Sequence, residues 1–353
     1  MKILKQLCLV CFSIFTIGAC VSHSNNISSK RENYNLPSVI EIVRESIVLI
    51  SASPNEDPTT NLSQNSLCSG AVVELQYIIT NFHCIYKQKY LRIYFWDEED
   101  WSEYKVKVVG RDPLADLALL EVIGSPKIVP PLRFAEEIPE IGEDVFAMGH
   151  PMGMVWTVTK GIISSKDRHA RHSFIKALQT DAAINVGNSG GPLLNMKGEI
   201  VGINALIVSK VKENAGIGLA IRSDIVRSSF KSMVYSGEVH RPAIGVRIGL
   251  LTSETQRKTI IKELPEIKTA QIPNTYGLII FPTDNMPEGL QVGDTIVGVN
   301  TALVNNGVDL TDALSTYNIG ETVTLTLIRK RRFIKVDVPL RQFEVPVESM
   351  YKK

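Results

Sequence analysis

The chain has 353 residues, of which 44% are hydrophobic and 21% are charged, and its formal net charge is +1. This composition is typical of a globular protein and excludes a disordered or fibrous one, and the length predicts roughly two to three domains. The charge balance gives no indication of a nucleic-acid partner, and none is expected.

The first twenty residues have the three parts of an export signal: a basic start, an apolar stretch over 7–17, and small residues before Cys20. The apolar stretch is too short for an ordinary membrane-spanning helix. The four residues ending at Cys20 resemble the bacterial lipobox, in which the cysteine is lipidated. We therefore predict a lipoprotein signal peptide over 1–19, lipidation of Cys20, and a flexible polar tether over 20–35. A plain cleaved signal with a chance cysteine is the alternative.

Residues 36–236 are predicted to form one domain, because short apolar segments alternate there with turns. Many strands at short spacing are typical of a barrel or a sandwich. The predicted strands are 47–53, 68–75, 77–84, 91–96, 105–110, 117–122, 144–149, 159–165, 192–195, 199–206 and 216–221. A helix is predicted from Ser223, with a serine cap and a glycine stop at Gly237.

A second domain is predicted over 237–345, followed by a tail over 346–353. Its strand patterns surround one helical pattern at 308–317, which indicates a small α+β module. The basic run from Arg329 to Arg332 is predicted to lie at a hairpin turn. Residues 251–275 fit no pattern that we can place.

Two cysteines, Cys68 and Cys84, remain in the part of the chain that is predicted to fold after export. Two thiols in an exported protein suggest one disulfide. Cys84 directly follows His83, and Cys68 lies in the preceding strand, so a bridge would cross a hairpin and fix the loop that carries the histidine. The alternative is two buried free thiols.

The stretch NVGNSGGPLL, residues 185–194, holds Ser189 on a glycine-rich turn before an apolar run. It matches both the G-x-S-x-G elbow of α/β-hydrolases and the serine turn of trypsin-like proteases. The elbow requires a helix after the serine and a later histidine. Two strand-like runs follow instead, and the only later histidine is His240 at the domain junction. The context therefore disfavours the elbow, and with it an esterase.

Two upstream residues complete a set for nucleophilic catalysis. His83 ends an apolar run, and Asp116 immediately precedes an apolar strand. The order His83, Asp116, Ser189 is the chain order of the chymotrypsin group. Asp112 is the rival carboxylate, but it precedes a proline and is interpreted as a turn residue.

Four segments carry a resemblance to a known family: TNFHC (80–84), DPLADLALL (112–120), GHPMGMVWTVTKGIISS (149–165) and QTDAAINVGNSGGPLLNMKGEIVGINA (179–205). Together they resemble the HtrA (Deg) family of trypsin-like serine proteases. RPAIGV and EGLQVGDTIVGVN make the second domain similar to a single PDZ domain. The resemblance implies a mainly β fold, with a chymotrypsin-like double β-barrel followed by a small α+β PDZ domain.

The resemblance also implies roles for the site residues. His83 would be the general base, Asp116 would orient and stabilise its imidazolium, and Ser189 would attack a peptide carbonyl. An oxyanion hole would form at Gly187, Asn188 and Ser189, with the backbone N–H groups of Gly187 and Ser189 as donors.

Specificity and peptide binding follow from the same resemblance. Ala183 and Ile184 would lie near the base of the primary pocket, where no acid is present, so a small or medium apolar side chain is expected before the cut. The PDZ domain would bind a C-terminal peptide as an added strand. Its carboxylate-binding residues would be Ala243, Ile244, Gly245 and Val246.

The implied function is that of a serine endopeptidase of the bacterial cell envelope that cleaves misfolded or unfolded proteins. It would be anchored by lipid on the periplasmic side, and Val21 after Cys20 favours the outer membrane. A homotrimer is expected, without a metal or a cofactor. The alternatives are a regulatory protease that cuts one signalling substrate, and a catalytically silent peptide-binding holdase.

Overall fold

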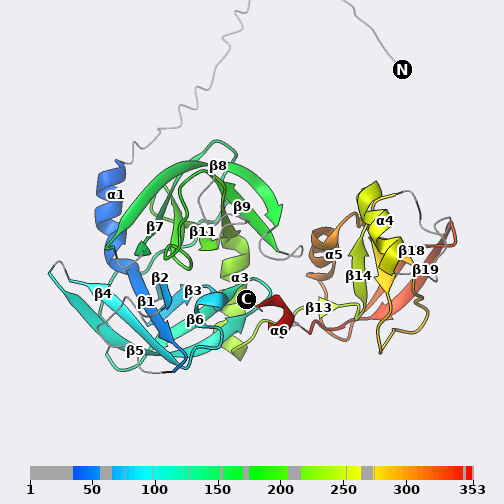
Figure 1. The fold of residues 1–353 in the computed structure, drawn as a ribbon, viewed down its shortest axis with the longest axis horizontal. Helices are drawn as coiled ribbons and strands as arrows, with labels where there is room; N and C mark the ends of the chain where they lie inside the picture. Colours follow the sequence, from blue (N-terminus) through cyan, green and yellow to red (C-terminus); the bar gives the residue numbers. More distant parts are fainter. Residues whose placement is uncertain are drawn as a thin grey trace, which may run out of the picture. The chain divides into compact units, whose positions relative to one another are not determined.

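Figure 1 shows the computed structural model of the chain. The structure describes residues 35–55, 66–74, 76–97, 99–125, 127–151, 154–169, 175–205, 216–251, 253–263, 273, 275–344 and 347–351. The predicted signal peptide, Cys20 and nearly all of the predicted tether lie outside these residues.

The first half of the predicted protease domain is a closed barrel with strand order β1-β2-β3-β6-β5-β4, all neighbours being antiparallel. Its strands are β1 (Ile47–Ser53), β2 (Ser66–Glu74), β3 (Tyr77–Thr80), β4 (Tyr90–Trp96), β5 (Trp101–Asp112) and β6 (Leu117–Val122). β1 is buried along its whole length, as expected for an apolar strand with both faces covered.

The second half is another closed barrel, with strand order β10-β11-β12-β9-β8-β7. Its strands are β7 (Asp144–Gly149), β8 (Thr157–His169), β9 (Lys176–Thr180), β10 (Pro192–Asn195), β11 (Ile200–Ala205) and β12 (Gly218–Arg222). One apolar cluster joins the barrels, because it contains Ile47 of the first, Phe146 of the second and Phe230 of helix α3 (Ser223–Ser236). The predicted double β-barrel is therefore confirmed.

Helices occupy few positions around the barrels (Figure 1). Among the described residues up to 236, they are α1 (Leu36–Val43), the short 3-10 helix η1 (Arg44–Ser46), α2 (Phe82–Ile85) and α3. α3 ends where predicted, with Gly237 in the left-handed region at φ 78° and its N–H bonded to the carbonyl of Met233.

α2 differs from the sequence prediction, which continued a strand through residue 84. β3 stops at Thr80, and His83 lies on one helical turn instead. The carbonyl of Asp116 accepts hydrogen bonds from the N–H of Phe82 and the side-chain amide of Asn81, both at 3.0 Å. These bonds come from a loop distant in sequence, so the strand pattern of 77–84 could not show where the strand ends.

The second domain has its own sheet, with strand order β14-β15-β16-β18-β19, and its own apolar core. The elements are β13 (Pro242–Ala243), β14 (Arg247–Leu250), α4 (Glu254–Glu263), β15 (Leu278–Phe281), β16 (Thr295–Val299), β17 (Ala302–Leu303), α5 (Gly307–Leu314), β18 (Thr322–Arg329), β19 (Arg332–Pro339) and β20 (Arg341–Gln342). The α+β prediction is confirmed. α4 lies in the stretch that the sequence pattern left unassigned.

The turn between β18 and β19 lies at the predicted basic run. Lys330 and Arg331 both have positive φ, 47° and 66°, between the paired residues Arg329 and Arg332. This is the backbone form that two-residue hairpins favour.

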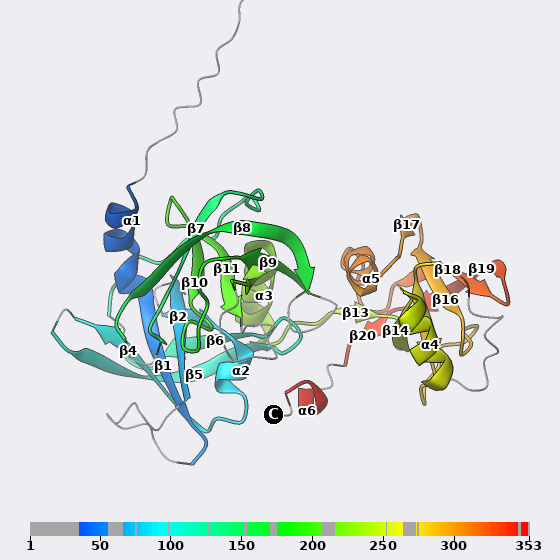
Figure 2. The same cartoon turned by 45° about the horizontal axis from the view of Figure 1, so that its top comes forward.

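A last short helix, α6 (Val347–Met350), follows the second domain and is seen clearly in Figure 2. Within the described residues, no helix is both long enough and apolar enough to cross a membrane.

Candidate active site

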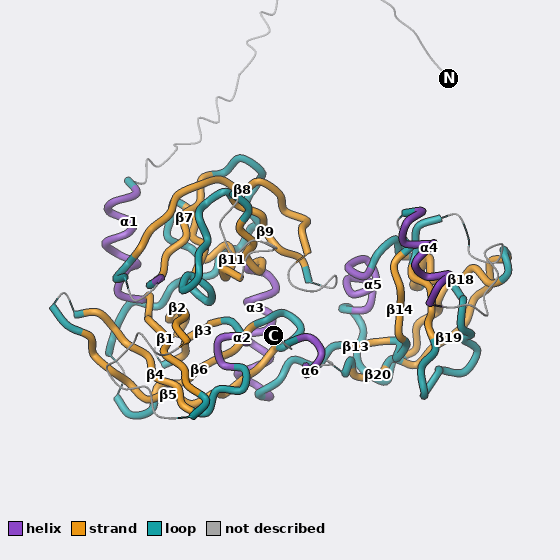
Figure 3. The backbone as a smooth tube through the Cα atoms, in the orientation of Figure 1, coloured by secondary structure: helices purple, strands orange, loops and turns teal. Residues whose placement is uncertain are grey.

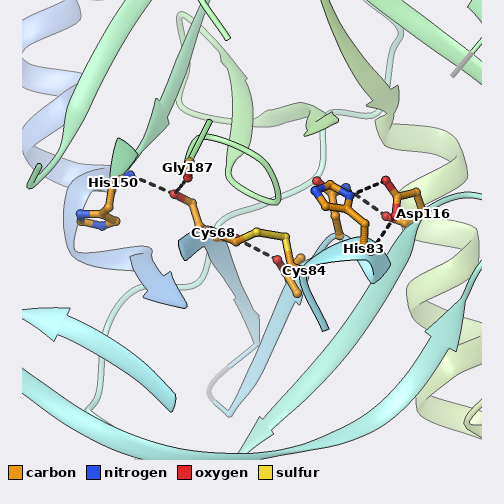
Figure 4. The surroundings of a disulfide bond; sticks show 9 residues. Cys68, His83, Cys84, Asp116, His150 and Gly187 are labelled. Atoms are coloured by element: carbon orange, nitrogen blue, oxygen red, sulfur yellow. Dashed lines mark hydrogen bonds and ion pairs between the residues drawn. A yellow bond between two sulfur atoms is a disulfide. The ribbon is translucent and has the colours of Figure 1, made fainter. Parts of the chain in front are cut away.

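His83 and Asp116 form a hydrogen-bonded pair, with 2.7 Å between Nδ1 and Oδ2 (Figure 4). A carboxylate only accepts, so Nδ1 carries the proton and Nε2 is left to accept one. The backbone N–H of His83 donates to Oδ1 of the same carboxylate at 2.8 Å. Asp116 is almost fully buried, while the histidine side chain is 19% exposed. The pair therefore has the geometry of a base held by a buried carboxylate.

The turn before β6 presents the Asp116 carboxylate. Asp116 itself has a φ of 58°, which few non-glycine residues adopt. Its carbonyl is fixed by the two bonds from Asn81 and Phe82, and its N–H points to the carbonyl of Pro113 at 3.4 Å. A positive φ at a non-glycine residue costs energy, so it persists only where the surrounding contacts hold the backbone in that conformation.

Asp112, the rival carboxylate, is engaged elsewhere. It is fully buried at the end of β5 and accepts two bonds from the guanidinium of Arg241, at 2.7 and 2.6 Å. The hydroxyl of Ser229 and the N–H of Ala115 also donate to it. Asp112 does lie at a turn, since its carboxylate accepts the N–H of Ala115 three residues later, and it is also the anchor of a buried ion pair that the sequence did not indicate.

Ser189 lies on a turn with positive φ at Gly187 and Gly190, 103° and 82°. A Cβ at Gly190 would lie 2.2 Å from the hydroxyl of Thr80, so only glycine fits there. Gly190 therefore packs directly against the end of β3, two residues before α2 begins, and the turn lies against the strand that leads to His83.

The hydroxyl of Ser189 is buried and has no hydrogen-bond partner among the described residues. Buried polar groups are nearly always paired, so an unpaired one requires an explanation. The structure brings His83 and Asp116 into contact, but it shows no hydrogen bond between Ser189 and His83 in the described part of the chain.

Two backbone N–H groups near Ser189 make no hydrogen bond among the described residues. The described hydrogen bonds of the turn use the N–H groups of Asn188, Gly190 and Gly191, and include none from the N–H of Gly187 or Ser189. These last two are the donors that the sequence analysis assigned to an oxyanion. Asn188 is buried, and its amide points to the carbonyl of Ala183 at 3.4 Å.

The two predicted pocket residues differ in their surroundings. Ala183 is partly exposed, and its carbonyl accepts a bond from Thr159. Ile184 is fully buried in the core of the second barrel, with Val145 and Ile163 among its cluster. Their contribution to substrate specificity stays a prediction.

Cys68 and Cys84 are joined by a disulfide in the structure (Figure 4), with their sulfur atoms 2.04 Å apart. The bridge connects β2 to α2, directly beside His83. The ring of His83 lies within 4.8 Å of both sulfur atoms. Sulfur atoms bonded to each other are not thiolate ligands, so this group does not fit a metal ion while the disulfide is intact.

Ser69, next to Cys68, is a site residue that sequence reasoning missed. Its N–H donates to the carbonyl of Ser189 at 2.8 Å, and its hydroxyl donates to the carbonyl of Gly187 at 2.6 Å. The same hydroxyl accepts the N–H of His150 at 2.9 Å. Strand β2 thus fixes the turn of Ser189 through hydrogen bonds, a role that is visible only in the tertiary structure.

His150 is a second missed residue, and it is fully buried. Its Nδ1 accepts the N–H of Trp156 at 3.3 Å, so Nε2 carries the proton and points to the carbonyl of Ile47 at 3.2 Å. Burial lowers the pKa of His150 to about 4, partly opposed by the bond to Ile47. This histidine is therefore neutral near pH 7.

The predicted carboxylate-binding residues of the second domain line a groove of about 530 Å³. The residues concerned are Ala243, Ile244, Gly245 and Val246. Strand β14 and helix α5 also contribute to the lining. Among the described strands, β14 lies at the edge of its sheet, which is the position where an added strand can pair.

Comparison with known proteins agrees with this architecture. Residues 68–203 match the family model described as a trypsin-like peptidase domain, and residues 242–340 match that of a PDZ domain. The periplasmic serine endoprotease DegP of Salmonella typhimurium is 31% identical over 283 residues, covering 78% of this chain and 57% of the relative. A probable periplasmic serine endoprotease DegP-like of Pseudomonas putida strain F1 is 34% identical over 279 residues, covering 77% and 55%. The chain thus spans little more than half the length of these curated relatives.

Solved structures give the same result. The HtrA-type protease AlgW with a tripeptide superposes with a TM-score of 0.71 at 25% identity, covering 88% of this chain and 98% of that one. The serine endoprotease from Yersinia pestis has a TM-score of 0.66 at 26% identity, with the same coverage.

Proposed function

We propose that this chain, which carries a trypsin-like peptidase domain and one PDZ domain and is homologous to the HtrA (DegP-type) serine endoproteases, is itself a serine endopeptidase. The observations that carry the proposal are the hydrogen-bonded pair of His83 and Asp116 and the buried Ser189 hydroxyl, which has no hydrogen-bond partner among the described residues. The family's printed names place the relatives in the periplasm, and we propose the same compartment here.

The geometry supports an acyl-transfer mechanism. Asp116 holds Nδ1–H of His83, so Nε2 is the free base that takes the proton of Ser189 as its oxygen attacks a peptide carbonyl. The buried carboxylate then stabilises the imidazolium that forms. The same histidine returns the proton to the leaving amine, and water repeats the sequence on the acyl-enzyme.

Charge on the carbonyl oxygen develops during the attack. The N–H groups of Gly187 and Ser189 are the proposed donors to that oxygen, and they are aimed by a turn that Ser69 fixes. Removing such a donor from other serine proteases raises the activation free energy by about 3 kcal/mol.

The proposal is tested by digesting an unfolded protein, reduced casein, with the natural chain and with Ser189→Ala. We expect kcat to fall at least about a thousandfold in the variant, because the nucleophile is lost. Mass spectrometry of the fragments should show cleavage after small or medium apolar residues if Ala183 and Ile184 shape the pocket. Equal digestion by both forms would refute the assignment of Ser189.

A silent peptide-binding protein is the second candidate, favoured by the absence of a described Ser189–His83 hydrogen bond. Labelling of Ser189 by a fluorophosphonate distinguishes the two, since only an activated serine reacts. Labelling that appears on adding a hydrophobic C-terminal peptide would indicate a resting protease. No labelling under either condition would favour the binding protein.

We further propose misfolded or unfolded envelope proteins as substrates, C-terminal peptides as ligands of the groove beside β14, and a homotrimer as the assembly. These rest on the family resemblance. A regulatory protease with one signalling substrate is the alternative, and comparing cleavage of denatured and native envelope proteins separates them.

Lipid anchoring through Cys20 is a proposal from sequence alone, with the outer membrane favoured. Mass spectrometry of the mature N-terminus tests it, because a lipidated cysteine has a diacylglyceryl mass that an unmodified one lacks. Membrane fractionation identifies the membrane.

A further inference from the structure

After the PDZ-matching residues, the chain returns to the first barrel. α6 and Tyr351, here called the return segment (residues 347–351), lie next to α2 (Figure 3). Tyr351 is only 5% exposed and belongs to the same apolar cluster as Phe82 and Cys84, and Val347 and Met350 pack against that cluster. The return segment is therefore part of the barrel core, although the sequence places it beyond a separate domain.

The ring of Tyr351 contacts α2 on both sides of His83. Its centroid lies 4.9 Å from that of Phe82, edge to face, and 5.2 Å from that of Tyr86. Aromatic pairs at these distances are favourable beyond their buried area. At the exposed edge of the segment, Glu348 pairs with Lys87 at 3.1 Å.

The hydroxyl of Tyr351 reaches the other half of the site. It lies 2.5 Å from the carbonyl of Pro113 and 3.2 Å from Oδ1 of Asp116. A hydroxyl has one proton, which these two acceptors share, with the shorter bond going to Pro113. Oδ1 is also the oxygen that accepts the N–H of His83.

We propose that Tyr351 is a positioning residue for the catalytic carboxylate, an inference that rests on the proposed function. One side chain touches both the helix that carries His83 and the turn that presents Asp116. The turn needs such support, because Asp116 adopts a positive φ that costs energy unless its surroundings hold it. The active site is thus incomplete without the return segment.

The ring and the hydroxyl of Tyr351 make different contacts. The ring contributes packing, which a phenylalanine would keep. The hydroxyl bridges the first and last residues of the turn from Pro113 to Asp116, which a phenylalanine would lose. Tyr351→Phe therefore separates positioning from core stability.

The test compares the natural chain with Tyr351→Phe and with a matched control, Tyr86→Phe. Tyr86 belongs to the same aromatic group, but among the described residues its hydroxyl makes no bond to the 113–116 turn. The measurements are kcat and KM on reduced casein, the rate of fluorophosphonate labelling, the melting temperature, and the downfield proton NMR signal of His83 Nδ1–H.

For Tyr351→Phe we expect kcat and the labelling rate to fall about fivefold, the effect of losing one hydrogen bond that acts on the carboxylate. KM and the melting temperature should stay close to those of the natural chain, and the downfield signal should shift or broaden. Tyr86→Phe should match the natural chain in all four.

An unchanged kcat and an unchanged downfield signal in Tyr351→Phe would overturn the inference. So would equal losses in Tyr351→Phe and Tyr86→Phe, because the effect would then be one of packing. If the natural chain neither cleaves nor labels, the proposed function fails. The NMR signal still decides the positioning role in that case, since it reports the His83–Asp116 bond without turnover.

Discussion

At the scale of single residues, the candidate site depends on side chains that act through backbone turns. The N–H of Ser69 donates to the carbonyl of Ser189, and its hydroxyl donates to the carbonyl of Gly187 and accepts the N–H of His150, so this one residue connects the two barrels. His150 continues this connection to β1 through Ile47. Both are buried, and neither has a direct role in the proposed chemistry.

The burial of His150 predicts a pH dependence of stability. Its folded pKa of about 4 lies below its ordinary value of 6.5, so the unfolded chain takes up a proton that the folded chain does not. Above about pH 6.5 the burial of neutral His150 does not lower the free energy of unfolding. As the pH falls from 6.5 towards 4, protonation of the unfolded chain lowers that free energy progressively. We expect His150 to contribute a loss of about 2 kcal/mol between pH 7 and pH 4.5.

Urea unfolding of the natural chain and of His150→Gln at both pH values checks this prediction. The variant keeps a neutral side chain that can donate to the Ile47 carbonyl, so its free energy of unfolding should depend less on pH by that amount. An identical pH dependence in the two proteins would contradict it.

At the scale of elements, the end of β5 is joined to the segment before β13. Asp112 and Arg241 form a bidentate pair, with the carboxylate fully buried and the guanidinium partly so. The chain leaving α3 is also fixed here, since the N–H of Arg111 donates to the carbonyl of Gly237. Asp112 lies four residues before Asp116, so the ion pair stabilises the end of the strand that leads into the turn of Asp116.

Arg241→Met should lower the free energy of unfolding of the barrels by roughly 3 kcal/mol, because it leaves a buried carboxylate without its counterion. Chemical denaturation followed by tryptophan fluorescence measures the loss. Adding Asp112→Asn to that variant should recover part of it, since the uncompensated charge is then gone. No recovery would show that packing by the arginine, and not charge, dominates.

At the scale of the whole molecule, the barrels and the PDZ-matching region bury separate apolar cores. The barrel clusters draw on residues from 39 to 233 and on Tyr351 of the return segment, whereas the cluster around Leu325 and Ile280 draws on residues from 244 to 340. Separate cores predict separate unfolding transitions.

Leu325→Ala should destabilise only the second domain, by about 3 kcal/mol, because a fully buried leucine leaves a cavity in β18. Calorimetry of the full chain should show one transition moved to lower temperature and the other unchanged. Binding of a hydrophobic C-terminal peptide should weaken in parallel. A single transition that moves as a whole would indicate one cooperative unit.

Much of this protein is determined by its sequence alone. The strand spacing predicts a barrel or a sandwich, and the resemblance to the HtrA family implies the double barrel. The order of His83, Asp116 and Ser189 predicts that these three residues form one set. The mainly β fold is confirmed, because strand period and turn chemistry are local properties. The grouping of the three residues stays a prediction beyond the observed His83–Asp116 bond. The glycine conformations around Ser189 and the hairpin at Lys330 follow the local sequence closely.

Tertiary structure alone decided the features that depend on long-range contacts. The strand before His83 stops and a helical turn begins because the N–H of Phe82 donates to the carbonyl of Asp116. The ion pair of Asp112, a residue that the sequence places only at a turn, depends on Arg241, which lies 129 positions later. Tyr351 joins the barrel core from 235 positions beyond Asp116. No pattern in a short window records such contacts, because they arise only when the folded chain brings distant segments together and excludes water between them.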